Sequence, residues 1–576
     1  MDNEFFVNSI LSYRDLFIND KLPNVRAILS VVSRETLLQW VFKLSSTYEN
    51  CSLDKIFTFF SDDNPYKKII KTRLRIFEKE KCHNCKYVLY THTTILELLR
   101  IIFSISPRVQ QNNNIDPYKF EFELFKTILY INQKTSNCIV SQKDKNNISK
   151  LLYIHSLSRH QIEQNSFHDQ FVTQMYLSVM FFKQIELDKR YQEIYNLFLE
   201  RVGIKDWREY VRTIFYISTF IKINNNSQYI KNQMNLLNIN VMNYLSIYWK
   251  EGPIAYSATN EFDRTGNSDY RYFREKPFIK LTKDKYMISN VGFVVDKLFN
   301  GLYFDFVNIA RSKKNDFAQK IRSFFTEGFI EKTVFATLLK SISNSLHYTI
   351  SLSDTECKKI DNYSPPDFYL RNQENSVVIL FECKDIKINA WVKEQRDMNL
   401  IEKHIKNKLL RKTFNITENK EEKVDNPKGV GVGQLVDNMK RIRKQEFKWD
   451  RKVFSGIKIY PVLVISDMML ITYGFSQIMN NWYRDLFPKN IMENRPLIVM
   501  SLSCLIRYNN LFRNNGFEYY FELYYLFLKT NTADNIKGII KNNMSFDEYM
   551  STYFEYDVFL KENELWIKNE ILKNLD

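Results

Sequence analysis

The chain has 576 residues, with 82 Lys and Arg against 66 Asp and Glu and a formal net charge of +16. This length predicts two to four domains with large buried cores, and the basic excess favours a polyanionic partner such as nucleic acid. No Gly-rich phosphate loop, secretory signal or apolar run of membrane-spanning length occurs, so we expect no ATPase, no membrane attachment and a cytoplasmic location.

Residues 1–250 are predicted to form a helical region. Apolar and aromatic residues recur at intervals of three and four, for example at Phe171, Met175 and Val179. No fixed repeat period emerges, so a regular solenoid is not expected. We interpret the aromatic stripes as core, and we expect this region to sense a substrate or to bind a protein partner or a second copy of the chain.

A pair of cysteines within this region has metal-ligand spacing. Cys82 and Cys85 are two residues apart, and His92 follows them. This arrangement is half of a zinc site, but no second Cys pair follows at the usual distance. Reduced thiols are the default reading, and zinc is the alternative.

The helical pattern ends at about residue 250, and residues 251–300 are predicted to form a linker with a small hairpin. Apolar residues at 278–281 and 286–289 flank Lys283 and Asp284, as in a two-stranded hairpin. Residues 301–510 are predicted to form an α/β domain with a mixed central sheet. Residues 511–576 return to an aromatic-rich helical pattern and are predicted to be a helical C-terminal extension.

The α/β domain is predicted to begin with an amphipathic helix over residues 317–341. Apolar residues line one side of the helix, including Phe324, Val334 and Leu338. Two acidic residues, Glu327 and Glu331, lie on it one turn apart. An exposed helix carboxylate is a common alternative for either one.

Two carboxylates and a lysine follow at a spacing that suggests a site. Asp367 heads a strand-like segment, fourteen residues intervene, and Glu382 and Lys384 close a strongly apolar run at 377–384. Alternate side chains on a strand share a face, so Glu382 and Lys384 lie together and Cys383 points away. If the two segments pair as a hairpin, Asp367 lies beside Glu382.

The surroundings of this motif distinguish it from similar short patterns. Glu-x-Lys also occurs at 421–423 and 446–448, but in polar, loop-like or helical surroundings. Only the pattern at 382–384 ends an apolar run, and Pro366-Asp367 is the only Pro-Asp dipeptide in the chain. Ionisable groups rarely follow such a run without a partner or a function. A turn Asp before a hairpin, with a solvated Glu and Lys, is the alternative.

A long basic segment and a second helix come next. Residues 386–428 are predicted to be a helical insertion with a flexible loop, which contacts nucleic acid, gates the site or binds a partner. The helix at 431–442 places Leu435, Met439 and Ile442 on one stripe. Gln434, Asn438 and Arg441 fall on another stripe. Apolar runs at 458–466 and 496–502 are predicted to be buried strands.

Taken with its flanking helices, the motif of Pro366-Asp367 and Glu382-Cys383-Lys384 resembles the PD-(D/E)xK nuclease superfamily. The resemblance implies a restriction-endonuclease-like core over about residues 300–510. It implies that Asp367 and Glu382 bind Mg²⁺ or Mn²⁺, with the Cys383 carbonyl as a further ligand, and that Lys384 positions or activates water. It also implies roles for Glu331 in holding a metal or water and for Gln434 near the substrate phosphate.

These expectations together favour a metal-dependent endonuclease. The resemblance favours DNA over RNA as the substrate, and it is consistent with a role in prokaryotic antiviral defence. One alternative is a non-catalytic member of the same fold that binds nucleic acid or protein. The other is a helical interaction scaffold in which the motif is a coincidence.

Overall fold

The structure is a computed structural model of the chain. It describes residues 8–46, 56–81, 86–106, 115–136, 140–144, 146–160, 167–223, 229–231, 237–250, 270–313, 315–346, 348–361, 364–372, 376–416, 421–425, 428–451, 456–467, 470–486, 495–531 and 535–575. Cys82 and Cys85 lie outside these residues, so the zinc alternative is not addressed. The described chain forms two compact units, one of 1–137, 162–165 and 196–302, and one of 138–161, 166–195 and 303–576.

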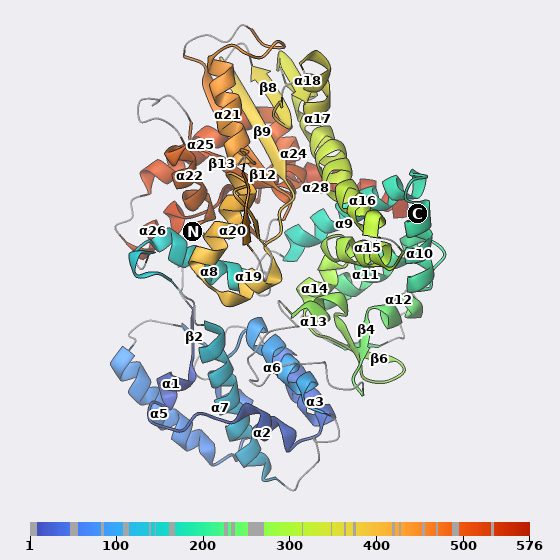
Figure 1. Cartoon of the computed structure of the whole chain (residues 1–576). Helices are drawn as coiled ribbons and strands as arrows, with labels where there is room; N and C mark the ends of the chain where they lie inside the picture. Colours follow the sequence, from blue (N-terminus) through green and yellow to red (C-terminus); the bar gives the residue numbers. More distant parts are fainter. Residues whose placement is uncertain are drawn as a thin grey trace. The chain divides into compact units, whose positions relative to one another are not determined.

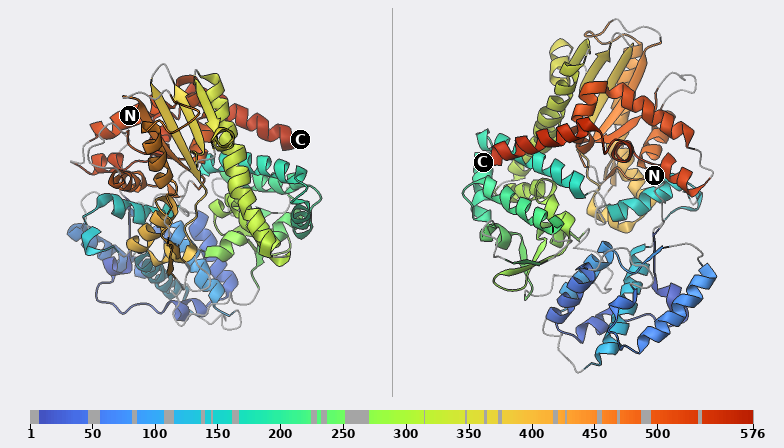
Figure 2. Two further views of the ribbon diagram at one scale, coloured as in Figure 1. Left: turned by 45° about the horizontal axis from the view of Figure 1, so that its top comes forward. Right: turned by 180° about the vertical axis from the view of Figure 1, so that it is seen from behind.

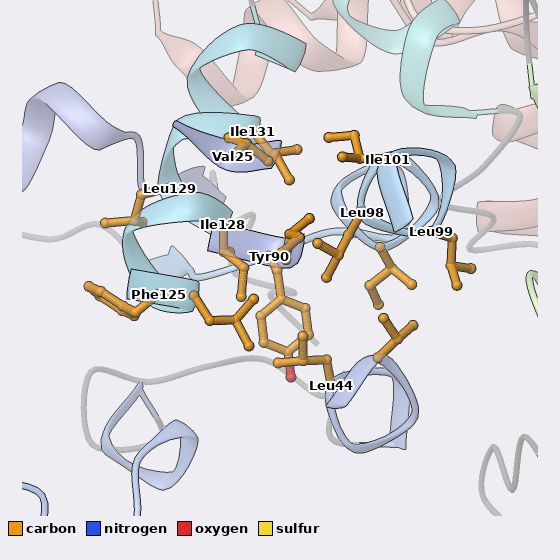
Figure 3. Packing of buried hydrophobic residues seen from close by; sticks show 14 of the residues in the cluster. Val25, Leu44, Tyr90, Leu98, Leu99, Ile101, Phe125, Ile128, Leu129 and Ile131 are labelled. Atoms are coloured by element: carbon orange, nitrogen blue, oxygen red, sulfur yellow. The ribbon is translucent and has the colours of Figure 1, made fainter. Parts of the chain in front are cut away.

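The first unit is built mainly from helices. Its elements before residue 137 are β1 Asn8–Ile10, α1 Tyr13–Leu16, α2 Val25–Ser30, α3 Arg34–Ser46, η1 Phe57–Phe59, α5 Tyr66–Lys81, β2 Lys86–Val88, α6 His92–Ser104 and α7 Pro117–Ser136. Helix α6 is apolar around most of its circumference and is buried along its length, in agreement with a central position. Figure 3 shows Leu98 and Ile101 of α6 packed with Ile128 and Ile131 of α7.

A small mixed sheet completes the first unit. The remaining elements are α11 Trp207–Ile223, β3 Tyr229–Lys231, α12 Ile239–Tyr244, β4 Ser246–Tyr248, α13 Arg271–Glu275, β5 Phe278–Lys280, β6 Lys285–Ile288 and α14 Val291–Asp296. The sheet order is β3-β6-β5-β4. Strands β5 and β6 pair antiparallel, which is the hairpin expected around Lys283 and Asp284. Helices α10 Gln192–Val202 and α15 Asn300–Lys313 contribute residues to both units.

The second unit contains a five-stranded mixed sheet in the order β13-β12-β9-β8-β7 (Figure 1). The strands are β7 Ile350–Ser353, β8 Phe368–Asn372, β9 Val377–Lys384, β12 Lys458–Ile465 and β13 Ile498–Ser501. Strands β7, β8 and β9 form an antiparallel meander. Strand β12 lies parallel to β9, and β13 lies parallel to β12. The predicted strands at 458–466 and 496–502 are therefore confirmed.

Helices cover both faces of this sheet, which explains why its strands are apolar runs rather than alternating patterns (Figure 2). One face, with Tyr369, Leu380 and Leu463, packs in a core with α8 Ile148–His160, α20 Met398–Leu409, α21 Val432–Arg443 and α22 Phe475–Asp485. On the other face, the ring of Phe381 contacts Phe335 and Phe517. Those two rings belong to η4 Phe324–Phe335 and α25 Phe517–Thr530.

The other helices of the second unit surround this core. They are η2 Gln142–Asp144, α9 Phe167–Leu187, α16 Asn315–Ser323, α17 Ala336–Ser345, α18 Asp354–Ile360, α19 Ala390–Gln395, α23 Leu502–Arg507, α24 Asn509–Asn515, α26 Ile536–Asn542, α27 Phe546–Tyr553 and α28 Val558–Leu575. A two-stranded ribbon, β10 Phe414–Ile416 with β11 Glu421–Lys423, lies in the basic segment after α20. Among the described residues, no helix is both long and apolar enough to cross a membrane.

The helix predicted over 317–341 is present, but its centre is a π-helix. Helix α16 leads into the π-helical segment η4, which continues as α17. The Thr333 hydroxyl donates to the Gly328 carbonyl at 2.9 Å, five residues earlier, as the wider π turn allows. The rings of Phe324 and Phe325 both contact Phe181 of α9. Long π-helices are rare and often occur at functional sites, and this one carries Glu331.

The basic segment after β9 folds onto the sheet rather than standing away from it. Helix α20 packs with α21 in the same core. Gly433 makes this contact possible, because a Cβ there would lie 2.1 Å from the Leu410 carbonyl oxygen. Gly431 has φ +55 and lies against Leu409, a conformation that favours glycine. The glycines before α21 therefore serve the approach of one helix start to the end of another helix.

Candidate functional site

Three predicted site residues meet at the ends of two neighbouring strands. The β8–β9 register pairs Phe368 with Phe381, which places Asp367 opposite Glu382. The Lys384 Nζ lies 3.2 Å from Asp367 Oδ2 and 3.0 Å from Glu382 Oε2. The backbone N–H of Cys383 donates to Asp367 Oδ2 at 2.7 Å. The hairpin expected from the sequence is thus formed, and it brings both carboxylates to one ammonium group.

Glu382 is an ionisable residue whose side chain is fully buried, where the charged form is unfavourable. Its side chain is 0% exposed, its Oε2 pairs with the Lys384 Nζ at 3.0 Å, and its Oε1 accepts no hydrogen bond from the part of the chain that the structure describes. Burial, followed by repulsion from Asp367, raises the pKa of Glu382 well above its ordinary value. Lys384 partly compensates the charge. Buried carboxylates without full compensation are uncommon, and they favour a cation or a proton nearby.

Lys384 is held in its charged form. Burial alone would lower the pKa of Lys384, but attraction to Glu382 and Asp367 outweighs this effect and raises it above its usual range. An ammonium with a raised pKa is a poor base and a good partner for negative charge. The geometry therefore suits Lys384 to orienting a water molecule or stabilising charge on phosphate oxygen, rather than to abstracting a proton.

Glu331 lies within electrostatic range of this cluster, although it forms no hydrogen bond or ion pair with it. Burial, followed by repulsion from Asp367, raises the pKa of Glu331 to about 7. Its rival, Glu327, is exposed and accepts a hydrogen bond from Lys332 at 2.7 Å, which lowers the pKa of Glu327. Of the two candidates on this helix, Glu331 is the one that faces the cluster.

Gln434 has a structural contact of its own. Its Oε1 accepts a hydrogen bond from the Gly431 backbone N–H at 2.9 Å, across the first turn of α21. This contact satisfies one of the donors left open at a helix start. No hydrogen bond joins Gln434 to Asp367, Glu382 or Lys384 among the described residues. On the same stripe, Arg441 donates to the Ser364 carbonyl at 3.0 Å and so holds the segment that leads to Asp367.

Cys383 lies at the centre of the sheet. It pairs in register with Val464 of β12, and its side chain is fully buried. Burial raises the pKa of the Cys383 thiol well above its ordinary value, with Glu331 as the next cause. The thiol is therefore not suited to metal binding or nucleophilic chemistry. A role for its carbonyl as a ligand remains a proposal.

Sequence reasoning missed one charged residue beside the cluster, Asp385. Asp385 directly follows Lys384 and accepts a hydrogen bond from the Ser466 hydroxyl, while the Ser466 N–H donates to the Lys384 carbonyl at 3.2 Å. Burial lowers the pKa of Lys408 of α20, and attraction to Asp385 opposes this effect without outweighing it. The sequence did contain a signal for such residues, because the apolar runs of β9 and β12 are both followed by polar residues. Since the two strands are parallel, these residues meet at the same edge of the sheet.

The residues present fit a hard divalent cation. Mg²⁺ commonly keeps several waters and takes only one or two protein carboxylates, with substrate phosphate supplying other oxygens. Asp367 and Glu382 are such a pair, and because a single lysine faces both carboxylates, their arrangement favours added positive charge. Among the described residues, no three His, Cys, Asp or Glu side chains form a ready-made metal cluster. The two-carboxylate set is therefore the protein's contribution.

Comparison of the chain with protein-family models, with curated proteins and with solved structures finds no match.

Proposed function

We propose that the protein is a metal-dependent nuclease whose active site is formed by Asp367, Glu382 and Lys384. One observation carries the proposal: a fully buried carboxylate, a second carboxylate and a charged lysine meet within 3.2 Å at adjoining strand ends. This combination supplies two hard oxygen donors and a fixed positive charge. An ion pair that serves structure alone needs one carboxylate, whereas Lys384 faces two.

The order of elements supports the proposal. A helical segment with Glu331 precedes an antiparallel β7-β8-β9 meander, and α21 then crosses to the parallel strand β12. This order agrees with the restriction-endonuclease-like core implied by the sequence resemblance. Helices α19 and α20 and the ribbon β10–β11 stand between β9 and α21 as additions to that core. The two helices pack on the sheet, so the insertion leaves the strand order intact.

Each residue of the proposed active site has its own role in the proposed cleavage. A divalent cation bound by Asp367 and Glu382 would stabilise charge on the phosphate and acidify a bound water. Lys384 keeps its proton, so it orients the attacking water and balances charge on a phosphate oxygen. Glu331, which interacts electrostatically with Asp367 and Lys384, would help to hold the metal or the water, as the resemblance implies. DNA is the favoured substrate on the strength of the resemblance.

The test is cleavage of DNA and RNA by the purified chain with Mg²⁺, with Mn²⁺ and with EDTA. We expect cleavage only with the divalent ions, and its loss in Lys384→Met. Lys423→Met is the matched control, because Lys423 is an exposed lysine in another Glu-x-Lys pattern. It is expected to cleave like the unaltered chain.

Three results would count against the proposal. Cleavage that persists in EDTA would remove the metal requirement, and cleavage that survives Lys384→Met would remove the assigned site. Nucleic-acid binding without cleavage under every condition would favour a non-catalytic binding protein. Circular dichroism of each variant establishes that a loss of activity does not reflect a loss of fold.

A further inference from the structure

An exposed aromatic ring with a cation above it lies on α15 of the second unit. Phe304 is 52% exposed, and its ring meets Tyr303 edge-to-face at 5.0 Å. The Lys387 Nζ lies 4.7 Å from the centre of the Phe304 ring and 3.9 Å from that of Tyr303. Single exposed apolar side chains are common on protein surfaces, so it is the cation held over the ring, and not the exposure itself, that distinguishes Phe304.

Lys387 lies over the ring, and two arginines act electrostatically on its neighbour Tyr303. Residues Phe304 and Arg311 are seven apart on α15 and so lie on one face of the helix. Burial raises the pKa of Tyr303, and the nearby Arg322 and Arg311 oppose that rise. Within the part of the chain that the structure describes, Arg311, Arg322 and Lys387 form no ion pair with a carboxylate. One lysine over an exposed ring and two arginines that act on the adjoining Tyr303, against the nearby carboxylate of Asp385, favour a ligand that is both anionic and planar.

The ring is connected to the proposed active site through a short stretch of chain. Lys387 follows Lys384 by three residues, in the segment between β9 and α19 (Figure 1). Asp385 interacts electrostatically with both Tyr303 and Glu331. The segment from Lys384 to Lys387 therefore links the ring of Phe304 to the cluster at Asp367.

We propose that the exposed face of Phe304 stacks a base of an unpaired nucleic-acid strand whose phosphates contact Arg311 and Arg322. Bases in a duplex are stacked on one another, so only an unpaired base offers its face to a protein ring. The inference rests on the proposed function and makes it more specific, because it assigns an unpaired strand as the substrate. Phosphate contacts alone would not need the ring.

Binding in EDTA tests the inference separately from cleavage. The probes are a short oligothymidylate, an abasic oligomer of the same length and charge, and a duplex. We expect Phe304→Ala to weaken binding of the oligothymidylate about 5- to 150-fold, the range typical for loss of one stacked base. Binding of the abasic oligomer and of the duplex should change less than twofold. Phe304→Trp should retain affinity, and its fluorescence should be quenched by the oligothymidylate.

Tyr519→Ala is the matched control. Tyr519 is 51% exposed and meets Tyr520 edge-to-face at 5.1 Å, much as Phe304 meets Tyr303, but no cation lies over it. It is expected to bind all three probes like the unaltered chain. Such a result would show that the effect belongs to Phe304 and not to exposed rings in general.

Two outcomes overturn the inference. One is an equal loss, or no loss, for the oligothymidylate and the abasic oligomer in Phe304→Ala. The other is displacement of the oligothymidylate by polyglutamate at equal charge concentration, which would indicate an acidic protein partner. If cleavage fails with every substrate while stacking is observed, the nuclease proposal falls and the binding site stands.

Discussion

Replacing Glu331 by Gln is expected to change how the stability of the protein depends on pH. The pKa of Glu331 rises from 4.5 to about 7 in the folded chain, mainly through burial. Between these values the folded state holds a proton that the unfolded chain has released, so the free energy of unfolding falls as pH rises. At about 1.4 kcal/mol for each tenfold change in ionisation constant, the loss reaches at most about 3 kcal/mol.

The Glu331→Gln variant cannot ionise and should lose this dependence. We expect it to match the unaltered chain near pH 4.5 and to be more stable above pH 7, by at most about 3 kcal/mol. The assay is urea denaturation in EDTA at a series of pH values, followed by far-UV circular dichroism. Glu327→Gln is the control on the same helix, since the pKa of Glu327 is lowered by Lys332. It should give no gain above pH 7. The reasoning would be refuted if the free energy of unfolding depended on pH in the same way for Glu331→Gln and for the unaltered chain.

Three further predictions concern stability. In EDTA at neutral pH, the midpoint of urea unfolding of Glu382→Gln should be no lower than that of the unaltered chain, because burial and the neighbouring Asp367 disfavour the charged form of Glu382. Clear destabilisation would contradict this. Gly433→Ala should lower thermal stability by about 1 to 3 kcal/mol through the clash with the Leu410 carbonyl, whereas Gly328→Ala, with only ordinary contacts, should not. The pKa of His404 is lowered to about 4 by burial and then by Lys408, so stability should be lost as pH falls from about 6.5 to 4. His404→Leu should reduce that loss. An unchanged fall in stability between about pH 6.5 and 4 in this variant would contradict the prediction.

The β8–β9 hairpin and the strands β12 and β13 could be predicted because their patterns are strong, whereas β7 and the pairing of β12 with β9 and β13 were not predicted. The apolar run before Glu382 and the single Pro-Asp dipeptide were sufficient to place Asp367 beside Glu382. The runs at 458–466 and 496–502 are buried strands because helices cover both faces of the sheet. Local sequence was informative here because burial on two faces leaves a continuous apolar signal.

Other features depend on tertiary contacts and could not be predicted. The π form of η4 accompanies packing of Phe324 and Phe325 on Phe181, which lies far away in the sequence. The helical pattern predicted the helix that carries Gln434, but the contact of that side chain with the Gly431 N–H depends on how α21 begins. The fold of the basic segment onto the sheet depends on Gly433, whose role appears only when α20 lies beside it.

The central claim is that Asp367 takes part in metal-dependent phosphodiester cleavage. The most direct measurement is the single-turnover cleavage rate with Mg²⁺ for the unaltered chain, Asp367→Asn and Asp425→Asn. Asp425 is an exposed aspartate in the same unit, so its variant controls for the loss of one surface charge. We predict a fall of at least about a hundredfold for Asp367→Asn, as for loss of other groups that stabilise transition-state charge, and no change for Asp425→Asn. Equal rates for all three proteins would contradict the account.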